Sequence, residues 1–185
     1  MSQHEPEEHR DGKQDASSLG PTGSKHYQLR QKMVSIGKDY WIENEQGEQV
    51  YKIDGKALHV HRTLYFLDAH GNKLAKLVKS VLTLKETMEI TGPDGEELAV
   101  VKKDIFTPLK EHFVVNVKNG PDLEINGNNL DHEYTIGDDQ NKVAQVSKKW
   151  LNLRDSYSIS IEPGQDDVII LSVVLSIDTM THSSR

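Results

Sequence analysis

Lysines and arginines that recur close together are the side chains in this sequence with the clearest potential for chemistry. Such groups hold phosphate through charge-assisted hydrogen bonds, so several of them around one concavity would bind an anionic ligand. Adjacent residues of a strand point to opposite faces, so a lysine pair does not form a pocket by itself. A solvated strand face is the competing interpretation for each lysine. The candidates for an anionic-ligand site are Lys102, Lys103, Lys148, Lys149 and Arg154, with Lys76, Lys79 and Lys85 on a third stretch.

Two histidines, His59 and His61, are the weak candidates for a metal site. Residues i and i+2 of a strand point to the same face, so their imidazoles would lie side by side, as in some zinc sites. A third ligand would have to come from His70, His112 or His132. Two polar side chains alternating on an exposed strand face are ordinary, and this is the preferred interpretation. We therefore predict no metal and no cofactor.

Three aspartates near the C-terminus, Asp166, Asp167 and Asp178, suggest calcium, which prefers carboxylate oxygens. If residues 167–178 form a helix, however, Asp167 and Asp178 lie about 16 Å apart at 1.5 Å per residue. Two ligands that far apart cannot share one ion. The preferred interpretation is that Asp166 or Asp167 caps the start of the helix.

The common catalytic signatures are absent from the sequence. It contains no glycine-rich phosphate loop, no G-x-S-x-G, no H-E-x-x-H and no EF-hand spacing. It also lacks cysteine, which excludes disulfides and thiolate nucleophiles and fits a reducing compartment. Solvation at turn edges explains the acidic pairs Glu96-Glu97 and Asp138-Asp139. Acid and base groups could still be assembled from residues distant in sequence. We predict no catalytic residues.

Composition divides the chain into a tail and a folded part. Residues 1–25 are polar and acidic with almost no large apolar side chains, which predicts a disordered tail. His4 and His9 within it offer an alternative role in binding a metal or a partner. Residues 26–185 are sufficient for a single domain. The tail has no apolar segment typical of a signal peptide, so we expect a cytoplasmic protein. A formal net charge of −7 disfavours nucleic acid as a partner.

The most apolar stretch, residues 168–177, is the best candidate for the buried core around which the other elements pack. It is shorter than the roughly 20 residues that a helix needs to cross a bilayer, and aspartates flank it, so we predict no transmembrane span. The turn residues Pro163-Gly164, and Asp166 and Asp167 directly before the apolar stretch, favour the start of a buried helix. Its many β-branched residues favour a strand, but a buried helix is the preferred interpretation.

Regular turn signals predict about a dozen short antiparallel strands from Tyr27 onward. A sheet of that size must close into a barrel or split into two sheets. An apolar helix could then fill the barrel, and Trp41 and Trp150 are predicted to pack on its strands. Pro108 predicts a bend or a strand edge. The turn signals are Asn44–Gly47, Asp54-Gly55, Asp68–Asn72, Gly92–Gly95, Asn119-Gly120, Asn126–Asn129 and Gly137–Asn141.

Two long stretches resemble the LURP-one-related proteins, which are grouped with the tubby C-terminal domain and the phospholipid scramblases. They are "DGKALHVHRTLYFLDAHGNKLAKLVKSVLTLKETMEI" and "VSKKWLNLRDSYSISIEPGQDDVIILSVVLSIDTM". The resemblance covers about residues 27–182. It is most specific at Asp68-x-x-Gly71, at Lys148-Lys149-Trp150 to Arg154-Asp155-x-Tyr157, and at Asp167 through Asp178 as a closing helix.

The resemblance implies a mainly β fold, a twelve-stranded antiparallel closed barrel around a central apolar C-terminal helix. Tubby-like domains bind phosphoinositide head groups through a basic pocket, and scramblases are linked to calcium and lipid movement. Scramblases also use a cysteine-rich anchor, which this chain lacks. We therefore expect a non-enzymatic binding or scaffold module that recognises an anionic phospholipid or a protein partner on the barrel surface. The alternative is an enzyme or metal-binding protein that acts on a small molecule in a pocket at one end of the barrel.

Overall fold

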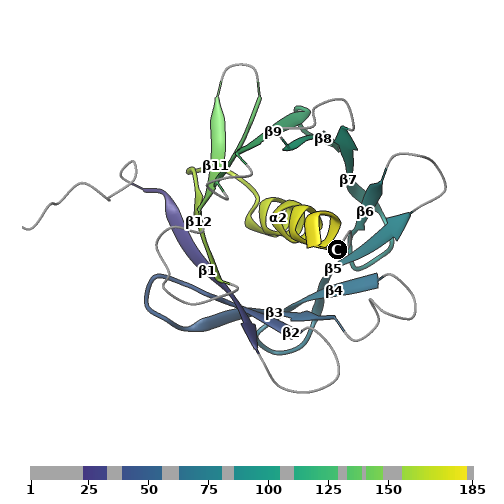
Figure 1. Cartoon of the computed structure of the whole chain (residues 1–185). Coiled ribbons are helices and arrows are strands. Elements are labelled where there is room, and N and C mark those ends of the chain that lie inside the picture. The colour runs from purple at the N-terminus through teal and green to yellow at the C-terminus, as the bar shows by residue number, and fades with distance from the viewer. Residues whose placement is uncertain are drawn as a thin grey trace, which may run out of the picture.

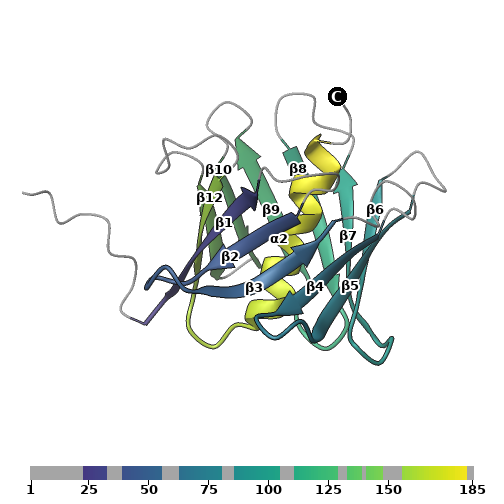
Figure 2. The ribbon, with the colours of Figure 1, turned by 90° about the horizontal axis from the view of Figure 1, so that it is seen from below.

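Twelve antiparallel strands form a closed barrel, and one helix runs through its interior (Figures 1 and 2). The computed structural model of the chain describes residues 23–32, 39–55, 63–80, 86–104, 111–128, 133–138, 141–147 and 156–182. The strands are β1 (Lys25–Lys32), β2 (Asp39–Glu43), β3 (Gln49–Asp54), β4 (Thr63–Asp68), β5 (Lys73–Ser80), β6 (Thr87–Thr91), β7 (Glu97–Asp104), β8 (Glu111–Val117), β9 (Leu123–Asn128), β10 (Glu133–Gly137), β11 (Lys142–Ser147) and β12 (Ser156–Ile161). The helix is α2 (Asp167–His182).

Each strand pairs with the next one along the chain, and β12 closes the ring by pairing with β1, where Lys25 lies opposite Ile161 and Leu29 opposite Tyr157. Closure leaves no edge strand with unpaired backbone groups, which is the liability that a long open sheet carries. The predicted antiparallel closed barrel with a central C-terminal helix is confirmed.

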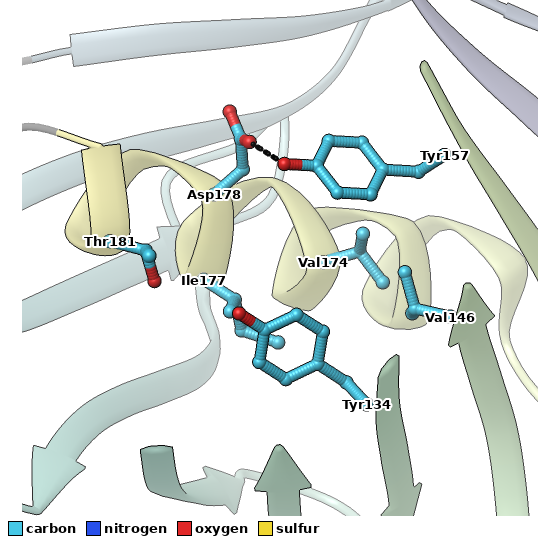
Figure 3. Close-up of a pocket in the computed structure, with 7 residues that line it drawn as sticks. All are labelled: Tyr134, Val146, Tyr157, Val174, Ile177, Asp178 and Thr181. Atoms are coloured by element: carbon cyan, nitrogen blue, oxygen red, sulfur yellow. Dashed lines mark hydrogen bonds between the residues drawn. The ribbon is translucent and has the colours of Figure 1, made fainter. Parts of the chain in front are cut away.

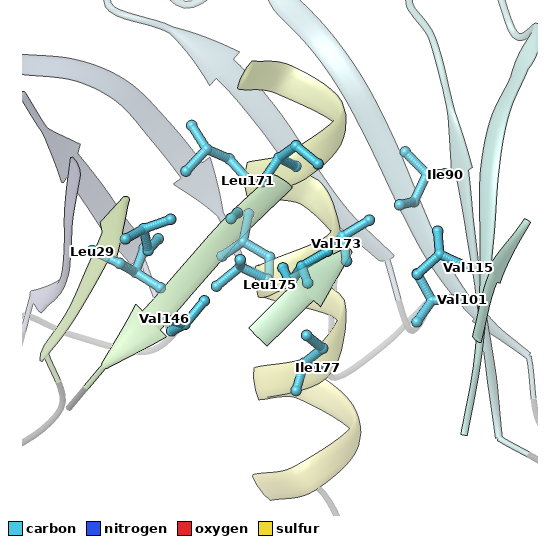
Figure 4. Close-up of a cluster of buried hydrophobic side chains, with 14 of the residues drawn as sticks. Leu29, Ile90, Val101, Val115, Val146, Leu171, Val173, Leu175 and Ile177 are labelled. Carbon is cyan, nitrogen blue, oxygen red and sulfur yellow. The ribbon is translucent and has the colours of Figure 1, made fainter. Parts of the chain in front are cut away.

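Alternate side chains of the strands fill the space between the barrel wall and α2. On β7, Ala99 and Val101 are fully buried, whereas Val100 and Lys102 between and after them are more exposed. Among the strands, β5 and β7 lie nearest to α2. Their inward residues include Ala75 and Ala99, whose small side chains allow the close approach. Figure 4 shows Leu171, Val173, Leu175 and Ile177 of the helix among the side chains of the surrounding strands.

Burial, and not helix propensity, explains why residues 167–182 are helical. Valine and isoleucine are poor helix formers, but a helix satisfies its own backbone hydrogen bonds. An unpaired strand in the apolar interior would leave its N–H and C=O groups without partners. Asp166 caps the helix by accepting a hydrogen bond from the backbone N–H of Ile169 at 3.1 Å, which confirms the predicted capping role. The helix ends at His182, one turn beyond the predicted Asp178.

The two ends of the barrel have different connections. At the turn end, where β1 and α2 begin, the connections are residues 44–48, 69–72, 92–96, 118–122, 138–141 and 162–166. At the exit end, where β1 ends and α2 ends, the connections are residues 33–38, 55–62, 81–86, 105–110, 129–132 and 148–155. In Figure 2 the turn end lies below and the exit end above.

One predicted turn lies further along the chain than expected, because the reversal between β9 and β10 comes after Asn128. Asn126–Asn129 was expected to reverse the chain, but β9 continues through Asn128. The glycine that suggested a turn, Gly127, is buried and pairs with both Glu111 and Tyr134, so it is a strand residue between two neighbours. The predicted bend at Pro108 lies outside the described residues.

Candidate functional site

The cavity beside α2 in the described part of the barrel is too small for a ligand. It lies between the C-terminal half of α2 and the exit-end halves of β10, β11 and β12 (Figure 3). It offers about 10 Å³ to the centres of water-sized groups, which is room for about one water molecule. Its lining residues are Tyr134, Val146, Tyr157, Val174, Ile177, Asp178 and Thr181. A small-molecule pocket of ordinary size is several hundred Å³, so this cavity does not serve as one.

Asp178 connects α2 to two strands at the edge of this cavity. Its carboxylate accepts a hydrogen bond from the Tyr157 hydroxyl at 2.8 Å and from the Tyr40 hydroxyl at 3.4 Å. The first of these bonds is the dashed line in Figure 3. Burial, with the nearby Asp178 charge, raises the pKa of Tyr157 far above its usual range. The Tyr157 hydroxyl donates to Asp178, and this bond attaches α2 to β12.

A second aspartate makes the equivalent connection at the turn end. Asp167 accepts hydrogen bonds from Lys25 at 2.6 Å and from the Tyr27 hydroxyl at 2.9 Å. The bond and charge of Asp167 raise the pKa of Lys25, and burial together with the Asp167 bond raises the pKa of Tyr27. Asp167 and Asp178 are separated by about three helical turns, which places them on one face of α2. That face is turned toward β1, β2 and β12.

Two lysines point toward the interior at the exit end. Lys79 continues the inward alternation of Ala75 and Leu77, and its side chain is only 9% exposed. It forms an ion pair with Glu86 at 3.1 Å. Lys103 continues the alternation of β7 and lies 5.7 Å from the ring centre of Phe113. The inward direction of Lys79 and Lys103 was not predicted, although the alternation of buried neighbours could have indicated it.

The predicted lysine pair is split by the sheet. Lys102 is exposed on the outer side of β7, where it donates to the Asn116 side chain at 2.9 Å, whereas Lys103 faces inward. The other three predicted residues, Lys148, Lys149 and Arg154, lie outside the described residues, as does Trp150. They belong to the connection between β11 and β12, which three strands separate from β7 around the barrel. The structure thus places Lys102 and Lys103 on opposite faces of β7, and the grouping of all five candidates stays a prediction.

Two of the five histidine candidates, His70 and His112, lie in the described part of the chain. His59, His61 and His132 lie outside the described residues, and His70 belongs to the tight turn between β4 and β5. His112 lies on the outer wall, 3.4 Å from Asp104 and 3.7 Å from Glu124. Within the described ranges, no group of three or more His, Asp or Glu side chains is placed to hold a metal ion.

Tight turns account for the polar residues of the turn end. Asp68 accepts hydrogen bonds from the backbone N–H groups of His70 and Asn72, both at 2.8 Å, and from the Asn72 side chain at 2.7 Å. These bonds hold the pKa of Asp68 below its usual range. Gly71 supplies the positive φ of 88° that this turn requires. The motif Asp68-x-x-Gly71 is thus a structural element.

Two aromatic and cationic pairs on the outer wall were not predicted. Lys52 lies 5.7 Å from the ring centre of Trp41, and Lys73 lies 4.8 Å from the ring centre of Tyr65. Trp41 was predicted to pack on a barrel strand, and it is half-buried on the outer face. The pairs depend on cross-strand register, which the sequence alone does not determine.

Comparison with known proteins assigns the chain to a family. A family model described as LURP-one-related matches residues 25–178, which span all twelve strands and most of α2. The chain belongs to the LURP-one-related family. The resemblance inferred from the two sequence stretches is thereby confirmed. None of the helices in the described ranges is long and apolar enough to span a bilayer.

Two known proteins are similar to this member of the LURP-one-related family. An uncharacterized protein of Bacillus subtilis (strain 168), YxjI, is 26% identical over 157 residues, which cover 85% of this chain and 94% of that protein. An X-ray structure of a protein from Arabidopsis thaliana matches with a TM-score of 0.63 at 17% identity, covering 86% of this chain and 92% of the other. The second match supports the fold, and neither description names an activity.

Proposed function

We propose that this LURP-one-related chain is a non-enzymatic, cytoplasmic binding module that docks on an anionic lipid surface through the exit end of its barrel. One observation carries the proposal: the connections at the two ends of the barrel differ in both charge and apolar content. The small cavity beside Asp178 adds support, since it has room for about one water molecule and not for a ligand.

The connections of the turn end are acidic and polar. They contain nine acidic residues and one lysine, with no valine, isoleucine, leucine, methionine, phenylalanine or tryptophan. The acidic residues are Glu45, Glu48, Asp94, Glu96, Asp122, Asp138, Asp139, Glu162 and Asp166. An anionic membrane surface would repel this end.

The connections of the exit end have the opposite composition. They contain eight lysines and arginines against three acidic residues, together with fifteen residues of the six large apolar types that the turn end lacks. The basic residues are Lys38, Lys56, Arg62, Lys85, Lys110, Lys148, Lys149 and Arg154. Cationic and apolar residues together are the composition of segments that bind the interface of an anionic bilayer.

The predicted anionic-ligand residues fit this end. Lys148, Lys149 and Arg154 belong to the β11–β12 connection, and Lys102 and Lys103 lie near the exit end of β7. Because β7 and β11 are on different sides of the barrel, we propose that these cations contact several head groups of one surface. A single pocket around one head group is not required. Each cation near an anionic surface contributes about 1 kcal/mol at low salt.

Co-sedimentation of the full chain with vesicles tests this function. The vesicles contain phosphatidylcholine alone, phosphatidylcholine with phosphatidylserine, or phosphatidylcholine with a phosphoinositide, each at low and high sodium chloride and with or without calcium. We expect binding only to the anionic vesicles, weakened by salt and independent of calcium. Soluble inositol phosphate as a competitor distinguishes a lipid surface, which it displaces poorly, from recognition of a free head group.

Two triple variants with the same change in charge provide the control. Changing Lys148, Lys149 and Arg154 to glutamate should reduce the partition coefficient more than a hundredfold, as expected for three lost cations at about 1 kcal/mol each. Changing Lys52, Lys73 and Lys76, on the outer wall, should have a much smaller effect. Equal losses in the two variants, or equal binding to neutral vesicles, would contradict docking through the exit end and leave a protein partner as the better explanation.

A further inference from the structure

The outer wall formed by β1 to β5 carries a cluster of aromatic and basic side chains that the lipid-binding proposal does not use. Trp41 pairs with Lys52, and Tyr65 pairs with Lys73, with each lysine within 6 Å of a ring centre. We name this surface the aromatic-basic wall; it consists of Arg30, Trp41, Lys52, Tyr65, Lys73 and Lys76. Aromatic residues and arginine are enriched where proteins bind other chains.

Cross-strand register makes these residues neighbours. Trp41 lies directly opposite Arg30 on β1 and opposite Lys52 on β3. Tyr65 on β4 lies directly opposite Lys76 on β5. Among the side chains that the structure describes, two acidic residues share the wall: Glu43, in an ion pair with Arg30 at 3.0 Å, and Asp54. The four cations exceed these two acids, so the wall has a net positive charge.

The outer side of β6 to β11 differs from the aromatic-basic wall in both charge and aromatic content. Its described outward residues include four acids, Glu89, Asp104, Glu124 and Glu133, and two lysines, Lys102 and Lys142. The aromatic residues described on these strands, Phe113 and Tyr134, are buried in the core. An acidic segment would therefore be attracted to the aromatic-basic wall and not to this side.

The chain itself contains such a segment. Residues 1–22 precede the described part of the chain and carry five acids, Glu5, Glu7, Glu8, Asp11 and Asp15, against Arg10 and Lys13. The segment joins the barrel at the start of β1, which is the first strand of the aromatic-basic wall. The acidic connections of the turn end lie beside that point and would repel it.

We propose that residues 1–22 dock within the same molecule on the aromatic-basic wall. The wall spans four strand spacings of about 4.8 Å, or about 19 Å from β1 to β5. Asp15 and Glu5 precede Lys25 by ten and twenty residues, and a flexible chain of those lengths has a root-mean-square reach of about 17 Å and about 25 Å. The acids are thus at the right distances, and the tether supplies an effective concentration on the order of millimolar.

Zero-length carbodiimide cross-linking of the unmodified full chain, followed by peptide mass spectrometry, tests the contact. The reagent joins carboxylates to amines that touch. At low salt we expect cross-links from the acids of residues 5–15 to Lys52, Lys73 and Lys76 at least about fivefold above those to Lys102 and Lys142, falling toward equality in high salt. A mixture of isotopically labelled and unlabelled chains should yield these cross-links within one chain. Equal yields on both sides, or cross-links mainly between chains, would overturn the proposal.

A variant in solution gives an independent measurement. In a Trp150→Phe background, Trp41 is the remaining tryptophan and reports on the wall by acrylamide quenching. Changing the five acids of residues 5–15 to their amides should raise the quenching constant about twofold at low salt and leave it unchanged at high salt. An unchanged quenching constant at low salt would overturn the proposal. Neither measurement involves lipid, so failure here leaves the docking of the exit end to be judged separately.

Discussion

The turn end and the exit end of the barrel show how one architecture divides its residues between structure and binding. At the turn end, the sequence supplies what tight turns require: Gly71 and Gly95 with positive φ, and Asp68 bonded to its own turn. At the exit end, the strands are joined by connections rich in lysine, arginine and large apolar residues. Turn geometry does not require these residue types, which is why a second role is expected of them.

Both ends of the barrel depend on α2, so a charge buried within this helix should give the largest loss of stability. Unfolding would remove the difference between the turn end and the exit end. Leu171 is fully buried, and Leu171→Asp places a charge in an apolar interior without a partner. We expect the protein to lose its cooperative thermal transition in circular dichroism. Leu171→Met, which roughly conserves volume, should cost less than about 1.5 kcal/mol. A Leu171→Asp variant that melts normally would show that α2 is not the core.

High pH should weaken the attachment of α2 at both ends. The pKa values of Tyr157 and Tyr27 are raised in the folded protein, so unfolding releases their protons. Their stabilisation is complete below the unfolded pKa of about 10 and is lost as pH rises further, with Tyr157 contributing up to about 1.4 kcal/mol per pH unit. Urea midpoints measured from pH 8 to pH 12 should fall above pH 10. Tyr157→Phe should make the fall in the urea midpoint less steep. An equally steep fall in this variant would contradict the contribution of Tyr157 to the pH dependence.

The two aspartates of α2 should contribute unequally. Asp178→Ala leaves the Tyr157 and Tyr40 hydroxyls without their acceptor and should cost about 1 to 3 kcal/mol. Asp167→Ala should cost less, because its partner Lys25 is 59% exposed and one Asp167 oxygen is buried without a hydrogen bond. Chemical denaturation measures both values. The reverse order would mean that the turn end holds the helix more firmly.

A change confined to the turn end should alter stability without altering binding. Gly71→Ala meets no neighbouring atom within 4 Å, so its cost is the positive φ of 88° alone, about 1 to 2 kcal/mol. We expect a lower urea midpoint and an unchanged affinity for anionic vesicles. Weaker vesicle binding by a folded Gly71→Ala protein would show that the turn end also contacts the lipid surface, which contradicts docking through the exit end alone.

The sequence predicted most of the fold because its signals were local. Turn residues such as Asp68 and Gly71 punctuate the strands, and the apolar run before Asp178 exceeds what any surface element could carry. Periodicity did not decide whether that apolar run forms a helix or a strand. The family resemblance indicated a helix. The backbone demand for hydrogen bonds inside a filled barrel explains the outcome.

The candidate site was much less predictable. Whether Lys102 and Lys103 point in or out depends on the register of β7 with β8, and the bond between Asp178 and Tyr157 joins residues on different elements. Trp41 and Lys52 meet only through the pairing of β2 with β3. Such contacts are set by cross-strand register and by the rotation of α2, and neither is encoded in local spacing.

Depth-dependent quenching by brominated lipids tests docking through the exit end most directly, because the two tryptophans occupy different places. Trp150 belongs to the β11–β12 connection of the exit end, and Trp41 lies on the outer wall. Single-tryptophan chains, Trp41→Phe and Trp150→Phe, would be bound to vesicles of brominated phosphatidylcholine and phosphatidylserine. We predict strong quenching of Trp150 and little quenching of Trp41. Equal quenching of the two, or stronger quenching of Trp41, would contradict the account.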